Sequence, residues 1–347
     1  MVFVKPRPRG RARPHPVTPN GGAPGSGDIY GALDLGTNNC RLLVARPADG
    51  GFRVIDAFSR IVRLGERLEA TGELAAEAME RTLEALAICR AKLDRRGVTR
   101  FRGVATEACR RARNGADFLA RVRAETGLVL EIIGPAEEAR LALAGCAPLL
   151  AQGSDRALLF DIGGGSTEVL WLERSRGPAW DVVDSISLRC GVVPFTERYG
   201  GDRLSQAAYA AMVSEVADML GPFEAAHAIA GKVADGGVQM LGTSGTVTTI
   251  AGVRLGLARY DRAQVDGSWL DLDHVFETSR ALAALDWPGR AAHPCIGPER
   301  ADLVVSGCAI LEAICRLWPV ARLRVADRGL REGILLGLMG APAAPAA

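Results

Sequence analysis

The chain has 347 residues, with 42 Lys and Arg against 40 Asp and Glu, and 48% of its residues are hydrophobic. This length suffices for two domains, and the composition excludes a disordered, collagen-like or coiled-coil protein. Residues 1–27 hold five bases and no acid, which leaves 37 bases (42 − 5) against 40 acids in the remainder. A polyanion site in that remainder must therefore be local, because no strong positive field surrounds it.

The cysteines and apolar stretches indicate a cytoplasmic protein without a membrane segment. The eight cysteines form no CxxC pair and have no histidine at ligand spacing, as expected of reduced thiols. The most apolar stretch, residues 303–317, contains Glu312 and Arg316 and is too short to span a bilayer. Residues 1–27 predict a disordered tail, more simply a solvated extension than a tether for polyphosphate or nucleic acid, and residues 341–347 predict a frayed end.

Hydrophobic periodicity in the first half predicts three strands before any helix, in the order βββαβαβα, within a domain of residues 28–147. The helices have apolar residues at helical spacing, and the last of them opens with Pro and two acids. In chain order we expect strands at 30–35, 41–46 and 52–64, a helix at 73–94, a strand at 101–106, a helix at 117–125, a strand at 128–133 and a helix at 135–145.

The second half begins in the same way and predicts a second domain over residues 148–328, followed by a helix at 329–340 that could pack back on the first domain. The expected strands are 157–162, 168–172, 182–188, 238–241 and 323–325, and the expected helices are 194–199, 206–220, 247–255, 272–285 and 300–317.

Two segments have the same sequence pattern, YGALDLGTNNCRLLV and ALLFDIGGGSTEVLW. Each has an apolar strand, an Asp, an apolar residue, a Gly, a polar turn and a second apolar strand. Asp34 and Asp161 are 127 residues apart, far longer than a solenoid period, so the repeat predicts two related domains that face each other. The cleft between such domains is the expected site.

The two turns have the residue types of a phosphate-binding nest, in which backbone N–H groups converge without needing net positive charge. A carboxylate beside such a nest would repel phosphate unless a cation lay between them, and Mg²⁺ suits Asp34 and Asp161 in this role. A single Asp-x-Gly turn often only closes a hairpin. Two matched copies, with a third turn LGTSGT before a helix, favour phosphate binding.

Glu137, Glu138 and Arg110 each allow two interpretations. The glutamates could offset a helix dipole, or one could accept a proton from water at the rim of a phosphate site. Arg110 could lie on a solvated basic face or clamp a phosphate, and its place after the strand VATE favours the clamp. Because the histidines are isolated in the sequence, we expect no catalytic histidine.

Seven ordered motifs closely resemble the exopolyphosphatase/guanosine pentaphosphate phosphatase (Ppx/GppA) family: GALDLGTNNCRLLV, VATEACRRARNG, EIIGPAEEARLALAG, LLFDIGGGSTEVLWL, LRCGVVPFTERYG, LGTSGT and VADRGLREG. The resemblance implies an α/β fold of two actin-like, ribonuclease-H-like domains with an interdomain cleft, and Mg²⁺-dependent release of the terminal phosphate of polyphosphate or pppGpp. The sequence resembles the short two-domain members of the family, so processive digestion of long polyphosphate chains is not expected.

The resemblance also implies residue roles. Glu138 is the expected general base, with Arg110 as its catalytic partner on the phosphate. Asp34, Asp161 and Glu168 are the expected metal ligands. The expected phosphate-binding residues are Gly36, Thr37, Asn38, Arg41, Gly163, Gly164, Gly165, Ser166, Thr167 and Gly245.

Two departures from the family pattern are Asn39 in the first turn and Glu107 beside the clamp.

An actin-like kinase and a non-catalytic alarmone or polyphosphate sensor remain alternatives. The expected partners are polyphosphate or a guanosine penta- or tetraphosphate, with a homodimer possible, no membrane and nucleic acid not expected.

Overall fold

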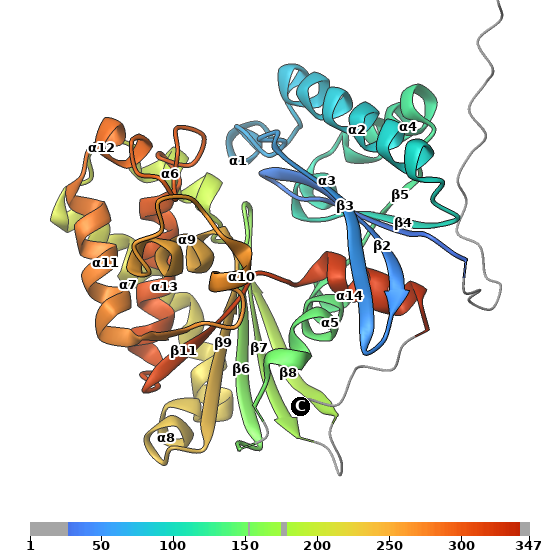
Figure 1. The fold of residues 1–347 in the computed structure, drawn as a ribbon. Helices are drawn as coiled ribbons and strands as arrows, with labels where there is room; N and C mark the ends of the chain where they lie inside the picture. Colours follow the sequence, from blue (N-terminus) through green and yellow to red (C-terminus); the bar gives the residue numbers. More distant parts are fainter. Residues whose placement is uncertain (1–26, 152, 175–178, 341–347) are drawn as a thin grey trace, which may run out of the picture.

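The computed structural model describes residues 27–151, 153–174 and 179–340. The predicted tail before residue 27 and the predicted frayed end at 341–347 lie outside these residues. The first domain contains a five-stranded sheet of order β3-β2-β1-β4-β5 with helices on both faces (Figure 1). Its elements are β1 (Tyr30–Leu35), β2 (Asn39–Ala48), β3 (Gly51–Ile61), α1 (Leu68–Thr71), α2 (Ala76–Arg96), β4 (Arg100–Ala105), α3 (Glu107–Arg111), α4 (Gly115–Thr126), β5 (Leu130–Ile132), α5 (Pro135–Cys146) and η1 (Ala147–Leu149).

The second domain contains a six-stranded sheet of order β10-β11-β9-β6-β7-β8. Its elements are β6 (Arg156–Ile162), β7 (Thr167–Arg174), β8 (Trp180–Leu188), α6 (Val192–Tyr199), α7 (Gln206–His227), α8 (Ile229–Ala234), β9 (Val238–Thr243), α9 (Gly245–Arg254), α10 (Arg262–Val265), β10 (Trp269–Asp271), α11 (Leu272–Ala284), α12 (Trp287–Ala291), α13 (Val304–Leu317) and β11 (Arg322–Ala326). The chain then returns to the first domain with α14 (Leu330–Leu338).

The two sheets are built alike. In each, the first strand pairs antiparallel with the second and parallel with the fourth. Leu35 pairs with Cys40 in the first hairpin and Ile162 with Thr167 in the second, so the registers match at the same offset of 127 residues. The strand β10, which extends the second sheet, has no counterpart in the first. The sequence repeat is therefore a repeat of structure.

Helices α5 and α14 lie side by side between the two sheets (Figure 1). Leu141 of α5 and Ile334 of α14 pack in one apolar cluster with the first sheet, whereas Leu143 on another face of α5 packs against the second. A Cβ on Gly333 would collide with the carbonyl oxygen of Leu141, so these helices approach at the level of their backbones. The N-terminal turn of α5 therefore lies at the cleft, and the chain passes to the second domain from the other end of α5, through η1.

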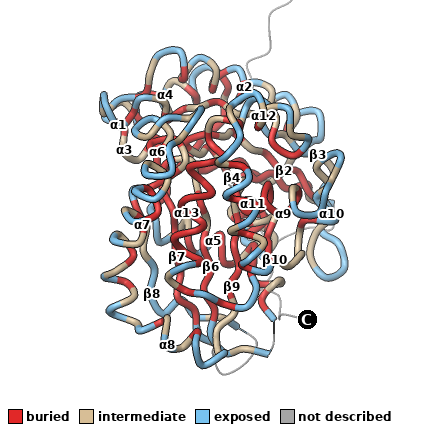
Figure 2. Tube along the Cα trace, turned by 90° about the vertical axis from the view of Figure 1, so that its left-hand side faces the viewer, coloured by how far each residue is buried: buried red, intermediate tan, exposed pale blue. Residues whose placement is uncertain are grey.

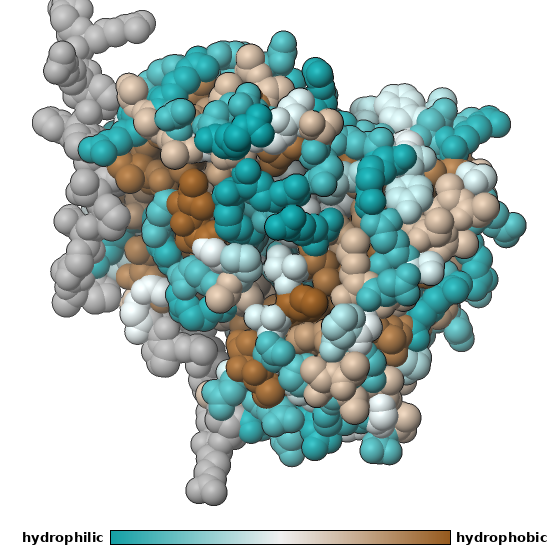
Figure 3. All heavy atoms as spheres, turned by 180° about the vertical axis from the view of Figure 1, so that it is seen from behind, coloured by the Kyte–Doolittle hydropathy of each residue, from teal (hydrophilic) through white to brown (hydrophobic). Residues whose placement is uncertain are grey.

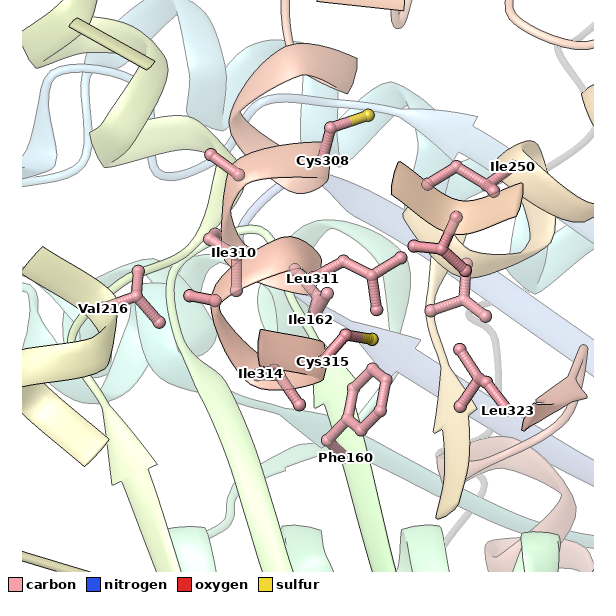
Figure 4. Close-up of a cluster of buried hydrophobic side chains, with 14 of the residues drawn as sticks. Phe160, Ile162, Val216, Ile250, Cys308, Ile310, Leu311, Ile314, Cys315 and Leu323 are labelled. Carbon is pink, nitrogen blue, oxygen red and sulfur yellow. The ribbon is translucent and has the colours of Figure 1, made fainter. Parts of the chain in front are cut away.

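The core of the second domain forms around α13, whose residues are almost all buried (Figure 2). Ile310, Leu311 and Ile314 of α13 pack with Phe160 of β6 and Leu323 of β11 (Figure 4). On the face seen in Figure 3, hydrophobic side chains occur in small groups among hydrophilic ones. Among the described residues, no helix combines the length and apolarity needed to cross a membrane.

Several boundaries differ from the sequence-based expectation. The helix expected at 206–220 continues through Pro222 to His227, because Phe223 packs against Trp318 in the core. The helix expected from Arg300 begins at Val304, and residues 300–303 form turns. The short elements α1, α3, α8, α10, α12 and β10 were not predicted.

Candidate functional site

The two Asp-x-Gly turns lie against each other at the meeting point of the domains. Each is closed by the same hydrogen bond, from Gly36 N to Asn39 O and from Gly163 N to Ser166 O, both 2.9 Å. A Cβ on Gly164 would lie 2.8 Å from the backbone nitrogen of Asn38, closer than any side chain tolerates. Glycine is therefore needed for this contact between the domains.

The second turn directs backbone amides away from α6. The carbonyl oxygens of Gly163 and Gly164 accept hydrogen bonds from Val192 N and Val193 N at the start of that helix. Because a trans peptide points its N–H opposite to its C=O, the N–H groups of Gly164 and Gly165 face the other side. Since both glycines line the cavity beside the turn, they have the arrangement of an anion-binding nest.

This cavity, which we call the carboxylate cavity, has a volume of about 130 Å³. Its walls come from both domains and include twelve of the residues predicted from the sequence. These are Asp34, Gly36, Thr37, Asn38, Arg41, Glu138, Asp161, Gly163, Gly164, Gly165, Ser166 and Gly245.

Three predicted residues do not line it. The hydroxyl of Thr167 is fully buried and donates to Cys190 O at 2.6 Å, so its contact is structural and not with the cavity. Glu168 pairs with Asp161 across β6 and β7, and its carboxylate accepts from Ser187 Oγ at 2.8 Å. Arg110 lies behind Glu138.

Glu138 occupies the first turn of α5, and its side chain is 17% exposed. Burial raises the pKa of Glu138 to about 9, and the charges of Glu168, Asp34 and Asp161 act in the same direction while Arg110 opposes them. In contrast, hydrogen bonds from Arg140 lower the pKa of the adjacent Glu137. The two neighbouring glutamates therefore have opposite electrostatic environments, and only Glu138 faces the cavity.

The guanidinium of Arg110 is held by protein groups. Its Nη1 donates to Ile133 O at 2.6 Å and to Glu138 Oε2 at 3.2 Å, and its Nη2 donates to Glu107 Oε2 at 2.6 Å. In this arrangement the guanidinium lies between Glu138 and Glu107, and the role of Arg110 as a clamp on phosphate stays a prediction. Glu107, the departure from the family pattern, lines the cavity and shares this guanidinium.

Asp34 and Asp161 have the donor chemistry for a magnesium ion. Burial raises the pKa of Asp34, and it raises that of Asp161 to about 7. Neither carboxylate has a hydrogen bond or ion pair within the described part of the chain. The part of the chain that the structure describes contains no group of three or more His, Cys, Asp or Glu side chains arranged to hold a metal ion. Two unpaired carboxylates still suit Mg²⁺, which binds through one or two of them together with phosphate oxygens.

A second cavity of about 650 Å³, which we call the arginine cavity, adjoins the first and shares Asp34, Arg41 and Asp161 with it. Arg41, Arg300 and Arg331 line it, and within the described residues the guanidinium group of none of the three makes a hydrogen bond or an ion pair. Burial lowers the pKa of Arg300 and of Arg331. Sequence reasoning assigned no role to Arg300 or Arg331, although Arg331 belongs to the motif VADRGLREG.

The third glycine turn also reaches both cavities through Ser244 and Gly245. The hydroxyl of Ser244 accepts from Thr246 N and Val247 N, each at 3.1 Å, and so caps α9. Two amides at this helix N-terminus are thus already bonded.

The structure has two α/β domains of like topology, and between them a carboxylate-lined cavity adjoins an arginine-lined one. This combination is typical of proteins that act on phosphate groups. The model of the Ppx/GppA phosphatase family matches residues 43–341, and the chain belongs to that family. Its fold is the actin-like duplicated-domain fold predicted from the sequence.

Solved structures of similar proteins share this fold. The Ppx/GppA family member of Aquifex aeolicus is 28% identical, with a TM-score of 0.72 over 89% of this chain and 97% of that one. An exopolyphosphatase-like protein is 26% identical, with a TM-score of 0.79 over 90% and 99%. An exopolyphosphatase from Cytophaga hutchinsonii, 24% identical, has a TM-score of 0.81 over 91% and 99%, which shows the shared fold.

Proposed function

We propose that the protein is a Mg²⁺-dependent phosphohydrolase that releases the terminal phosphate of inorganic polyphosphate, of pppGpp, or of both. The observation that carries this proposal is the joining of the two cavities. One contains Asp34, Glu138 and Asp161, whose mutual repulsion calls for a cation. The other contains arginines whose guanidinium groups have no partner among the described residues and would attract an anion. A metal-bound phosphate chain supplies both charges at once.

The turns hold the terminal phosphoryl group in this proposal. The N–H groups of Gly164 and Gly165 and the hydroxyls of Thr37 and Ser166 surround the carboxylate cavity and donate to the phosphoryl oxygens. Fixed donors of this kind stabilise charge in the transition state without reorganisation of solvent.

Glu138 accepts the proton of the attacking water at its carboxylate, and Arg110 keeps that carboxylate oriented toward the cavity. Asp34 and Asp161 would hold Mg²⁺, and the bound ion would neutralise phosphate oxygens. The same positive charge favours the ionised carboxylate, which lets Glu138 act as a base near neutral pH even though burial alone opposes its ionisation. Glu168 lies opposite Asp161 on the neighbouring strand, and its charge adds to burial in raising the pKa of Asp161, a repulsion that a bound cation would relieve.

The arginine cavity accommodates the rest of the substrate. Arg41 borders both cavities, so a chain whose terminal group lies among the turns continues toward Arg300 and Arg331. Inorganic polyphosphate and pppGpp share the terminal phosphoryl group and differ only in this second region. Its volume of about 650 Å³ falls within the range of ordinary ligand pockets.

The test is phosphate release from polyphosphates of several lengths and from pppGpp, each with Mg²⁺ or with a chelator. Release from at least one of them that stops on chelation is the expected result. Release at the same rate without metal would contradict the proposed role of Asp34 and Asp161. Release that requires ATP and an acceptor would indicate a kinase, and binding without release would indicate a sensor.

A further inference from the structure

Residues 62–67, which connect β3 to α1, reach across the cleft to the second domain. The guanidinium of Arg63 donates to both carboxylate oxygens of Asp302, with Nη1–Oδ2 at 2.7 Å and Nη2–Oδ1 at 2.9 Å. The same Nη2 donates to Glu299 O at 3.2 Å. A paired fork of this kind fixes direction as well as distance. It joins residues 239 positions apart in the sequence.

A second contact lies four residues further on. The backbone N–H of Arg67 donates to Glu197 Oε1 of α6 at 2.7 Å. Arg63 and Arg67 both have left-handed backbone conformations, with φ of 49° and 61°. Residues other than glycine adopt this conformation at a cost. The hydrogen bonds from Arg63 and Arg67 to the second domain offset the conformational free energy that this loop costs.

The same loop holds the phosphate turn of the first domain. Val62 N and Arg63 N donate to Asn38 O at 2.9 and 3.1 Å, and Gly65 N donates to Thr37 O at 2.9 Å. On the far side, Asp302 lies between Arg300, which lines both cavities, and Leu303, which lines the carboxylate cavity. The loop is therefore bonded to a cavity wall in each domain.

We propose that the pair Arg63–Asp302 is a latch that keeps the two domains closed around the substrate, which makes Arg63 a positioning residue for the reaction. The closed arrangement brings Thr37 and Asn38 against Gly164 and so assembles the nest. The catalytic part of this proposal rests on the proposed phosphohydrolase function, whereas the closure itself does not.

The exposure of the pair sets the expected size of the effect. The side chains of Arg63 and Asp302 are 34% and 21% exposed, so the pair is partly screened by solvent. We expect its loss to shift the closure equilibrium about tenfold toward the open form, in line with two charge-assisted hydrogen bonds at a half-buried site. Because only the closed form binds productively, KM rises by up to about tenfold, with a smaller change in kcat.

Steady-state kinetics on Arg63→Ala, Asp302→Asn and the double variant test the coupling. If the two residues act as one latch, the double variant is no worse than either single variant. Arg63→Lys keeps the charge but not the fork, so its KM lies between those of wild type and Arg63→Ala. Arg60→Ala is the matched control, because the guanidinium of Arg60 lies over the Phe58 ring and makes no hydrogen bond or ion pair with the described residues. KM values for the two single variants equal to that of the control, or effects that add in the double variant, overturn the latch.

A measurement without turnover separates this proposal from the proposed function. Glu84 of α2 and Glu277 of α11 are exposed and lie in different domains, so cysteines placed there can carry a pair of spin labels. In ligand-free full-length protein, Arg63→Ala lengthens or broadens the interdomain distance distribution and Arg60→Ala does not. Distributions unchanged in the latch variant overturn the proposal, whether or not the wild type hydrolyses any phosphate ester. Absence of hydrolysis with an altered distribution overturns only the function.

Discussion

Replacing Glu138 with glutamine should slow hydrolysis and stabilise the metal-free fold, an unusual combination. The folded carboxyl, with a pKa of about 9 against an ordinary value of 4.5, keeps a proton that the unfolded chain releases. Stability therefore falls as pH rises from 4.5 to about 9. The 2.5 pH units between 4.5 and pH 7 correspond to about 3 kcal/mol at most, at about 1.36 kcal/mol per unit.

A glutamine avoids this cost because it has no proton to release. Arg110 keeps its bonds to Glu107 and to Ile133 O in the variant, so the guanidinium is not orphaned. We expect Glu138→Gln to unfold later than wild type at pH 7 in chelator, by an amount that shrinks as pH falls toward 4.5. Turnover should drop by about 10²–10⁴-fold, the usual contribution of a general base.

The assays are urea unfolding between pH 4.5 and 8 and phosphate release at saturating substrate with Mg²⁺. Glu137→Gln is the matched control. Arg140 and Arg102 depress the pKa of Glu137, so its carboxylate stabilises the fold above its ordinary pKa. The control should lose stability at pH 7, by about 0.5–1 kcal/mol, and keep its turnover. Wild-type turnover in Glu138→Gln, or a loss of stability at pH 7, would refute the reasoning.

Three further predictions concern other parts of the molecule. Arg331→Ala should raise KM more for long polyphosphates than for tripolyphosphate, because Arg331 lines only the arginine cavity; equal effects on both would count against that cavity as the tail site. Asp56→Asn should cost about 1–2 kcal/mol at pH 7 in urea unfolding, because hydrogen bonds from Lys92 first, then Arg96 and Arg95, hold the pKa of Asp56 well below its usual range; this deficit should begin to shrink as pH falls below about 4, where the unfolded carboxyl takes up a proton, and should go on shrinking toward the much lower folded pKa. Arg290→Ala should cost about 3 kcal/mol or more, because this fully buried guanidinium bonds backbone carbonyls of three separate segments; an unchanged urea midpoint would show that water replaces those bonds.

The turns could be predicted from the sequence because their signal is local and repeated. Asp34 and Asp161 stand at the same position of two strand–turn–strand segments, and the same offset of 127 residues appears in the strand registers. The position of Glu138 in the first turn of a helix also followed from its neighbours, since Pro135 starts that helix.

The rest of the site depends on tertiary contacts that no local pattern contains. Arg300 lies in a turn and Arg331 in a helix, and they line one cavity only because α14 returns to the first domain. The partners of Arg110 come from α3, α5 and the end of β5, so its role beside Glu138 depends on how these elements pack. Likewise, nothing in the sequence around Arg63 indicates a partner 239 residues away.

The most direct test of the central claim is hydrolysis of polyphosphate with Mg²⁺ in water labelled with heavy oxygen. Attack by water on the terminal phosphorus predicts that each released phosphate carries one labelled oxygen and that the chain shortens by one unit per event. Unlabelled phosphate, or a phosphoryl group that passes to an acceptor molecule, would contradict the account.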